Sequence, residues 1–187
     1  MKTSQERGFT LVELLTVVAI LAIAGVLAVP SLNDLINRYR ADSIIQSYAL
    51  LLGSAREEAV KRQVTTTLCP TTDNRSCHSD WNSGVMIFSD TNGNALLDLD
   101  DSVIYSRSGL HENYSLEWKS FYQKPYIQFL PMGYTLRHNG TFVLCPANGN
   151  PLFARLLILN KPGRVRPGQD KDGDGVQEKP NGKPVQC

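Results

Sequence analysis

Glu13 is the residue near the N-terminus whose chemistry is least expected from its surroundings. It is the only charged side chain between Phe9 and Pro30, within a mostly apolar run. A carboxylate inside a membrane-spanning segment is costly, so such a residue indicates a function and needs a partner. Cleavage of the chain after Gly8 would create a free amine on Phe9, one helical turn from Glu13. The sequence therefore predicts a carboxylate–amine pair within a membrane.

Basic residues gather near the C-terminus, in a stretch that glycine and proline interrupt: Arg155, Lys161, Arg164, Arg166 and Lys171. Guanidinium groups fork onto phosphate oxygens without base-specific geometry, which suits contacts to a nucleic-acid backbone. An alternative also fits, because Arg164 and Arg166 alternate about Val165 as on the solvated face of a last β-strand. The formal net charge of the chain is +1, so total charge does not indicate a polyanionic partner.

The acidic residues that follow have the spacing of a calcium-binding loop. Oxygen ligands occupy positions 1, 3, 5 and 9 of such a loop, with glycine at position 6, and these positions hold Asp170, Asp172, Asp174, Glu178 and Gly175. Position 12 is Asn181 instead of a bidentate glutamate. The segment 90–101 has similar spacing, with alanine in place of the glycine. Either loop could bind Ca²⁺ weakly, or could be a turn rich in Asp, Asn and Gly; no cofactor is required.

The four cysteines all lie after the apolar run, at Cys69, Cys77, Cys145 and Cys187. In an oxidising compartment they predict two disulfides, with three possible connectivities. We favour Cys69–Cys77, which would close a turn-rich segment, and Cys145–Cys187, which would tether the end of the chain. Crossed pairing stays open, whereas the spacing does not fit a zinc site.

The histidines do not indicate an enzyme. They are scattered through loop-like sequence, at His78, His111 and His138, and no recognisable metalloprotease, hydrolase or phosphate-binding motif accompanies them. We therefore predict that the chain has no catalytic activity.

The apolar run Phe9–Val29 must position Glu13, and as a helix it would extend roughly 32 Å, enough to cross the hydrocarbon core of a bilayer. The small residue Gly8 precedes this run, whereas an ordinary signal peptide has its small residues after a shorter one. Lys2 and Arg7 would keep the N-terminus in the cytoplasm and direct the rest outward.

A helical pattern continues after Pro30, which we expect to end or kink the first stretch. Apolar residues then recur at three- and four-residue steps to about Gln63: Ile44, Ile45, Tyr48, Leu51, Leu52, Ala55 and Ala59. From Val64 onward, short β-like runs alternate with turns. The sequence thus predicts an α+β fold in which one long helix packs on an antiparallel β domain.

A resemblance to a known family rests first on segment 8–15, Gly-Phe-Thr-Leu-Val-Glu-Leu-Leu. This segment resembles the prepilin cleavage and methylation motif of type IV pilins and type II secretion pseudopilins. The resemblance implies cleavage after Gly8 and methylation of the Phe9 amine by a prepilin peptidase. It also implies that Glu13 meets the N-terminal amine of a neighbouring pilin. The chain would be a single-pass inner-membrane protein with a periplasmic C-terminal domain, and then part of an extracellular pilus filament.

Three downstream motifs narrow the resemblance: Trp81-x-x-Gly84-Val85-x-x-Phe88-x-Asp90-x-Asn92-Gly93-Asn94, Phe129-x-Pro131-x-Gly133 and Gly163-Arg164-Val165-Arg166. They are similar to segments of the family of secretion pseudopilin H and the minor pilins FimT and FimU, FimT above all. The resemblance implies a pilin fold with two β-sheets against the helix. We divide the chain into five segments: leader 1–8, transmembrane and assembly helix 9–30, amphipathic helix 31–63, β-rich domain 64–160 and disulfide-tethered tail 161–187.

The Gly-Arg-Val-Arg segment resembles the G-R-x-R element of FimT-type minor pilins. This resemblance implies capture of double-stranded DNA during natural transformation, with Lys161, Arg164, Arg166 and Lys171 as candidate contacts. Two other functions fit the same sequence. One is a structural or priming minor pilin of the pilus tip, and the other is a pseudopilin of a type II secretion system.

Overall fold

The computed structural model describes residues 8–110, 113–135 and 137–187, except for the side chains of residues 27–30. Lys2, Arg7 and His111, which figure in the sequence analysis, lie outside the described residues. The chain consists of two compact units, Met1–Tyr39 and Arg40–Cys187. One helix, α1 (Leu11–Arg62), contributes to both units.

The first unit consists of the N-terminal part of α1. Thr10 precedes the helix, and its hydroxyl accepts a hydrogen bond from the Glu13 backbone N–H at 3.2 Å, as an N-cap residue does. The apolar side chains from Phe9 to Val26 are largely exposed, and α1 is long and apolar enough to cross a membrane. The helix does not end at Pro30. Proline removes one backbone hydrogen bond from the helix. The remaining hydrogen bonds of the 52-residue helix keep it continuous through Pro30.

The second unit begins with the remainder of α1, which buries one side-chain stripe. Its members are Ala41, Ile45, Tyr48, Leu51, Leu52, Ala55 and Ala59, at the spacing of one helix face. The predicted stripe is confirmed, with Ile44 half-buried at its margin and Ala41 as an additional member. This stripe supplies the helical side of the main hydrophobic core.

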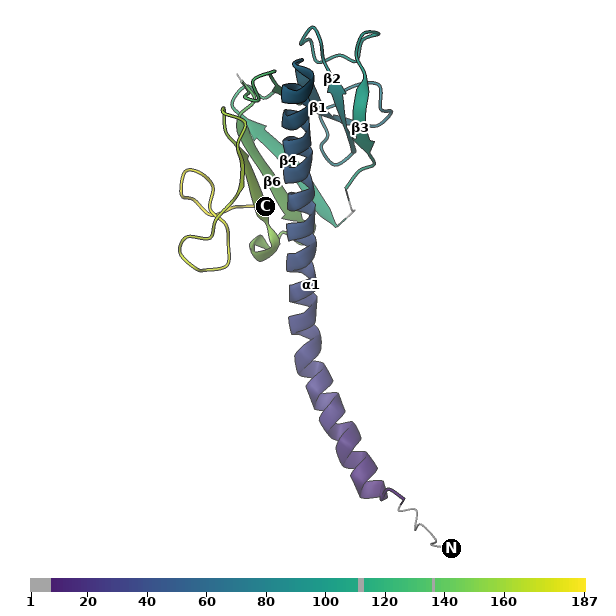
Figure 1. Ribbon diagram of the computed structural model, residues 1–187. Coiled ribbons are helices and arrows are strands. Elements are labelled where there is room, and N and C mark those ends of the chain that lie inside the picture. The colour runs from purple at the N-terminus through teal and green to yellow at the C-terminus, as the bar shows by residue number, and fades with distance from the viewer. Residues whose placement is uncertain (1–7, 111–112, 136) are drawn as a thin grey trace, which may run out of the picture. The chain divides into compact units, whose positions relative to one another are not determined.

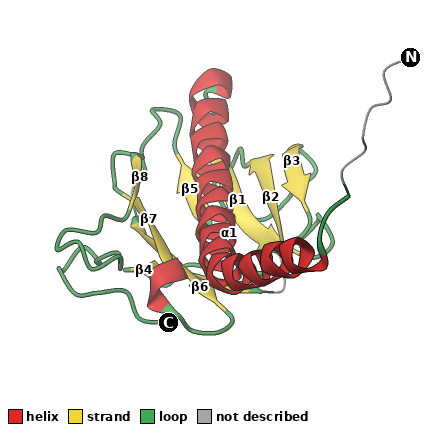
Figure 2. Cartoon of the chain, turned by 90° about the horizontal axis from the view of Figure 1, so that it is seen from below, coloured by secondary structure: helices red, strands yellow, loops and turns green. Residues whose placement is uncertain are grey.

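The described residues form eight strands in two antiparallel four-stranded sheets. Figure 2 shows β2 and β3 on one side of α1 and β7 and β8 on the other. The first sheet has the order β3-β2-β1-β5 and consists of β1 (Thr66–Thr71), β2 (Gly84–Ser89), β3 (Val103–Arg107) and β5 (Ile127–Phe129). The second has the order β4-β6-β7-β8 and consists of β4 (Tyr114–Ser120), β6 (Gly140–Pro146), β7 (Arg155–Leu159) and β8 (Val165–Pro167). A 3₁₀ turn, η1 (Pro151–Phe153), precedes β7. The predicted fold class is confirmed.

An aromatic cluster lies where α1 meets the second sheet. Phe142 packs between Trp118 and Trp81, with ring centroids 4.5 and 4.8 Å away, and Tyr48 lies 5.6 Å from Phe142. The Tyr48 hydroxyl donates a hydrogen bond to the Trp81 carbonyl at 3.0 Å. Because Trp81, Phe88 and Phe129 are also buried, the downstream family motifs supply core residues.

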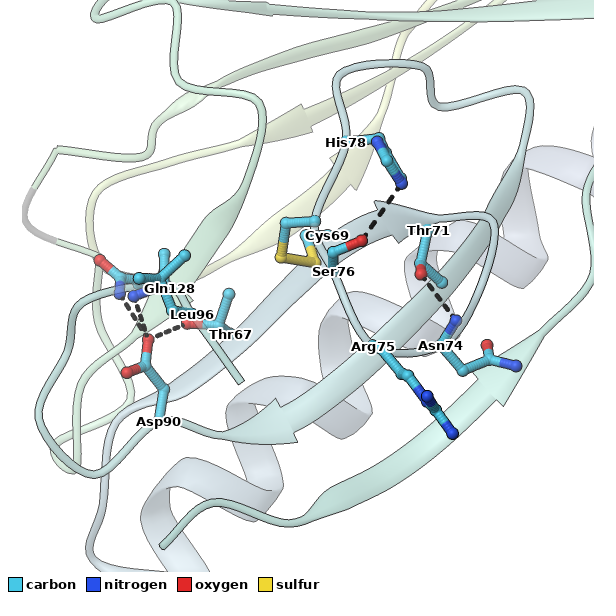
Figure 3. Close-up of a disulfide and its surroundings, with 12 residues drawn as sticks. Thr67, Cys69, Thr71, Asn74, Arg75, Ser76, His78, Asp90, Leu96 and Gln128 are labelled. Atoms are coloured by element: carbon cyan, nitrogen blue, oxygen red, sulfur yellow. Dashed lines mark hydrogen bonds between the residues drawn. A yellow bond between two sulfur atoms is a disulfide. The ribbon is translucent and has the colours of Figure 1, made fainter. Parts of the chain in front are cut away.

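The structure pairs Cys69 with Cys77 and Cys145 with Cys187, the two pairs that we favoured from the sequence. Figure 3 shows the first pair beside β1. In the loop that it closes, the Asp73 carboxylate accepts hydrogen bonds from the backbone N–H groups of Arg75 and Ser76, at 2.8 and 2.9 Å. These bonds hold the pKa of Asp73 below its ordinary value.

The C-terminal tail is packed as well as tethered. Val176 and Val185 are buried with Val143, Ala154 and Leu156, on the face of the second sheet that points away from α1. Figure 1 shows this segment in yellow, looping beside the sheet. The tail is therefore held by the apolar contacts of two of its valines as well as by the predicted disulfide.

Candidate functional site

Strand β8 and the turn before it carry the arginines of the Gly-Arg-Val-Arg segment. Val165 is half-buried against the main core, and it pairs with Leu159 of β7. Successive side chains in a strand point to opposite faces, so Arg164 and Arg166 lie on the opposite face, and both are exposed. Their Cα atoms are therefore about 7 Å apart along the strand. The strand interpretation is correct for Val165–Pro167, and Arg164, just before the strand, and Arg166, within it, are both exposed.

Gly163 allows the β7–β8 turn to pack closely against residue 133. Its φ is +75°, and a Cβ atom there would lie 2.3 Å from the Gly133 carbonyl oxygen. Arg56 of α1 donates a hydrogen bond from Nε to that same carbonyl at 2.6 Å. The glycines of two separate motifs thus meet on one helix arginine, and this contact fixes where the β7–β8 turn lies against α1.

Arg56 is a structural residue that sequence reasoning missed. Its place on α1 predicts only a polar side chain beside the buried stripe. It also lines a groove of about 510 Å³ between α1 and β8, together with Ala49, Gly53, Glu57, Val60, Lys61, Gly163 and Val165. No sequence signal links Arg56 to glycines that lie 77 and 107 positions further along the chain.

The other basic candidates fall in three different surroundings. Lys161 is exposed in the β7–β8 turn, and its carbonyl accepts a hydrogen bond from the Thr135 N–H at 2.8 Å. Lys171 lies in the acidic loop, where its backbone N–H donates a hydrogen bond to the Glu178 carboxylate at 2.9 Å. Arg155 is buried, and its guanidinium pairs with Asp42. The structure thus groups Lys161 with Arg164 and Arg166, and removes Arg155 from the exposed basic surface.

The acidic loop of the tail brings its carboxylates together. Carboxylate oxygens of Asp170, Asp172, Asp174 and Glu178 all lie within 4.8 Å of one another. Glu178 is buried, and the three aspartates are exposed. The backbone of Glu178 pairs with Gln169 through an N–H···O bond of 2.9 Å, which closes the base of the loop. Such a set of hard oxygen donors suits a calcium ion.

The segment 90–101 does not form a comparable cluster. The buried Asp90 accepts hydrogen bonds from Thr67, Gln128 and the Ala95 N–H, on the left of Figure 3. Asp98 accepts from the amides of Asn92 and Asn94, which lower its pKa. Within the described part of the chain, the tail loop is the one acidic group close enough to hold a metal ion. The carboxylates of Asp90 and Asp98 thus accept hydrogen bonds from the protein and do not converge with other acids as those of the tail loop do.

Two protein-family models match the sequence. Residues 45–163 match "Type II transport protein GspH", and residues 3–29 match the prokaryotic N-terminal methylation motif. The first match covers more than half of the chain. The chain belongs to the GspH family. The resemblance to the pseudopilin H and FimT/FimU family is thereby confirmed, and the second match coincides with the segment that contains Gly8, Phe9 and Glu13.

Solved structures of a minor pilin and of a minor pseudopilin have the same fold. The type IV minor pilin FimU of Pseudomonas aeruginosa (strain PAO1) has a TM-score of 0.54 at 19% identity, over 69% of this chain and 88% of FimU. The minor pseudopilin EpsH of the Vibrio cholerae type II secretion system has a TM-score of 0.50 at 16% identity, over 72% of this chain and 99% of EpsH. No curated protein matches the sequence significantly. The two family matches assign the chain to the pilins and pseudopilins, which are structural proteins.

Proposed function

We propose that this GspH-family chain is a minor pilin that is processed by a prepilin peptidase and assembled into a type IV pilus. Cleavage after Gly8 and methylation of Phe9 produce the mature N-terminus. The apolar part of α1 then holds the subunit in the inner membrane, with the residue 40–187 unit in the periplasm. Glu13 pairs with the N-terminal amine of a neighbouring pilin during assembly. The match to the methylation motif and the exposed apolar side chains of α1 support this proposal.

We further propose that the subunit binds double-stranded DNA through Lys161, Arg164 and Arg166. The observation that supports this proposal is the exposure of both arginines on either side of the half-buried Val165, at the start of β8. Neither guanidinium forms a salt bridge within the described part of the chain. Both are therefore free to contact phosphate oxygens, which carry no sequence information and give a salt-dependent affinity. Capture of this kind suits DNA uptake in natural transformation.

The DNA proposal predicts a specific loss in the Arg164→Ala/Arg166→Ala variant. Binding of a labelled duplex to the full-length protein in detergent micelles is measured by fluorescence anisotropy over a range of salt concentrations. The logarithm of the wild-type affinity should fall linearly with the logarithm of salt concentration. The double variant should lower that slope by about 2, because each phosphate contact contributes about 1. The duplex affinity at low salt should fall with it.

A matched control separates the site from net charge. Arg40→Ala/Arg75→Ala also removes two exposed positive charges. Arg40 lies roughly 24 Å along α1 from Arg56, which contacts the β7–β8 turn. This variant should keep the wild-type slope. Equal losses in both double variants, or no duplex binding by the wild type at low salt, would reject the DNA proposal. The subunit would then be a structural minor pilin or a secretion pseudopilin.

A second proposal concerns the acidic loop of the tail, which we propose binds Ca²⁺ after export. Asp170, Asp172, Asp174 and Glu178 supply carboxylate oxygens in the order of a calcium loop, and their oxygens already converge. Such a loop would join the end of the chain more firmly to the second sheet. Addition of Ca²⁺ should therefore raise the midpoint of thermal unfolding.

A further inference from the structure

One end of the second sheet carries cations at both of its edges. Through the strand register, Lys119 of β4 pairs with Thr141, Thr141 with Ile158, and Ile158 with Arg166 of β8. Residues in such a row share one face of the sheet. Lys119 and Arg166 therefore lie on the face that points away from α1, separated by three strand spacings or roughly 14 Å.

The β4–β5 loop at this end exposes two aromatic rings. Phe121 is 80% exposed and Tyr122 is 49% exposed. The two rings meet edge to face with centroids 5.1 Å apart, and the Arg137 guanidinium lies 5.9 Å from the Tyr122 ring centre. Lys124 is exposed on the same loop. We call Phe121, Tyr122, Lys124 and Arg137 the aromatic platform.

The platform and the β8 arginines belong to one end of the domain. Ser120, the last residue of β4, is in register with Gly140, which is in register with Leu159, and Leu159 with Val165. The β4–β5 loop and the β7–β8 turn therefore both leave the sheet at this end. Residues 131–135 lie beside that turn, because the Thr135 N–H donates to the Lys161 carbonyl at 2.8 Å.

The buried valines of the tail pack one row away from Lys119 and Arg166, which are both exposed. These valines pack on Val143 and Leu156, which lie one same-face row further along the strands from Thr141 and Ile158. Glu117 lies two residues before Lys119 in β4, on the same face of the sheet. Its carboxylate pairs with the Lys119 ammonium at 2.9 Å. Because that pair is exposed, its mutual attraction is weak. Lys124 and Arg137 have no salt bridge within the described residues.

We propose that the aromatic platform binds an unpaired segment of DNA whose backbone continues from the β8 arginines. Bases inside a duplex are stacked on one another and cannot reach a protein ring. An unpaired base can stack on Phe121 or Tyr122, while Lys124 and Arg137 contact its phosphates. The course of the DNA backbone from Arg166 to the platform rests on the proposed duplex binding. Stacking of a base on the platform requires only a single strand. The subunit therefore recognises a junction between duplex and single-stranded DNA.

The test compares three labelled DNAs bound to the full-length protein in detergent micelles: oligothymidine, a blunt duplex, and the duplex with an oligothymidine overhang. The wild type should bind the overhang DNA more tightly than the blunt duplex. Phe121→Ala/Tyr122→Ala should weaken oligothymidine and overhang binding about tenfold, and leave the blunt duplex unchanged. Arg164→Ala/Arg166→Ala should weaken the two duplex-containing DNAs most. Both aromatic side chains are exposed, so the thermal midpoint of the aromatic variant should equal that of the wild type.

A spectroscopic variant reports stacking directly. Phe121→Trp places an indole on the platform, whereas Trp81 is buried and Trp118 half-buried. Oligothymidine should quench the added fluorescence, and the blunt duplex should not. Absence of oligothymidine binding by the wild type, or equal effects of the aromatic variant on all three DNAs, would overturn the inference while leaving duplex binding intact. If the wild type bound oligothymidine but not the blunt duplex, the proposed duplex binding would be rejected, whereas stacking of bases on the aromatic platform would be supported.

The surface chemistry also permits an anionic lipid headgroup, because exposed aromatic rings beside cations are typical of membrane-interface residues. Vesicles with and without phosphatidylserine provide this comparison. Platform-dependent binding to the anionic vesicles, together with no binding of oligothymidine, would assign the surface to lipid and overturn the DNA inference.

Discussion

Replacement of both Cys145 and Cys187 by serine should lower the free energy of unfolding of the residue 40–187 unit by about 4 kcal/mol. The bridge joins residues 42 positions apart, and the chain-entropy model gives that value for closure of a loop of this length. The tail also contributes buried side chains, Val176 and Val185, to the outer face of the second sheet. The bridge stabilises the fold by restricting the unfolded chain. Its loss should therefore lower the free energy of unfolding even though these contacts persist in the folded state.

Denaturant unfolding of the full-length protein in detergent measures this loss. Wild-type protein treated with a reducing agent should lose at least as much stability as the double variant, because reduction also opens the Cys69–Cys77 bridge. The single variant Cys187→Ser is the control for an added free thiol, and it should match the double variant. A loss below about 1 kcal/mol would contradict the predicted role, because a bridge over so long a loop restricts the unfolded chain strongly.

Calcium should stabilise the same unit, by about 2.7 kcal/mol at a free concentration one hundred times the dissociation constant. The reason is linkage: an ion that binds only the folded loop shifts the equilibrium toward the folded state. The four carboxylates, which lie within 4.8 Å of one another, also repel one another until a cation is bound. The effect should appear as a rise in the thermal midpoint that grows with calcium concentration.

Asp172→Asn/Asp174→Asn should abolish that rise, since both oxygens lose their charge. Asp100→Asn is the matched control, because Asp100 is an exposed acid in the segment 90–101, outside the tail loop. It should leave the calcium response unchanged. If the control lost the response as well, or if the wild type showed none, the tail loop would be only a turn rich in aspartate and glycine.

Local patterns predicted those parts of the structure that depend on local spacing. The buried stripe of α1 follows from apolar residues at helical steps, and Ala55 and Ala59 lie where that period puts them. The strands other than β8 coincide with β-like runs between turns. The acidic loop has its donors at the expected positions. Each of these features is determined by residues within a few positions of one another.

Contacts between distant segments could not be predicted in the same way. Arg56 meets Gly133 and Gly163 only because the two turns pack on one face of α1. Arg155 looks like one more exposed cation in the sequence, yet its pairing with Asp42 removes it from the surface. The aromatic platform likewise depends on strand register, since Phe121 lies 45 positions from Arg166 in a sequence with no local signal to join them.

Segment 90–101 shows the reverse case, in which a local pattern is modified by distant contacts. Its spacing alone suggests a second calcium loop, but Asp90 is buried and bonded to Thr67 and Gln128. Thr67 and Gln128 belong to β1 and β5, so the competing bonds exist only once the first sheet has formed. Motif spacing therefore identifies candidate ligands, whereas the sheet decides which of them remain available.

We propose that this GspH-family chain becomes a filament subunit through its processed N-terminus. Mass spectrometry of the N-terminal peptide, from protein recovered in sheared filaments, tests it most directly. We expect a peptide that begins with N-methylated Phe9 and includes Glu13. A peptide that retains Met1, or one that begins after Pro30, would contradict it.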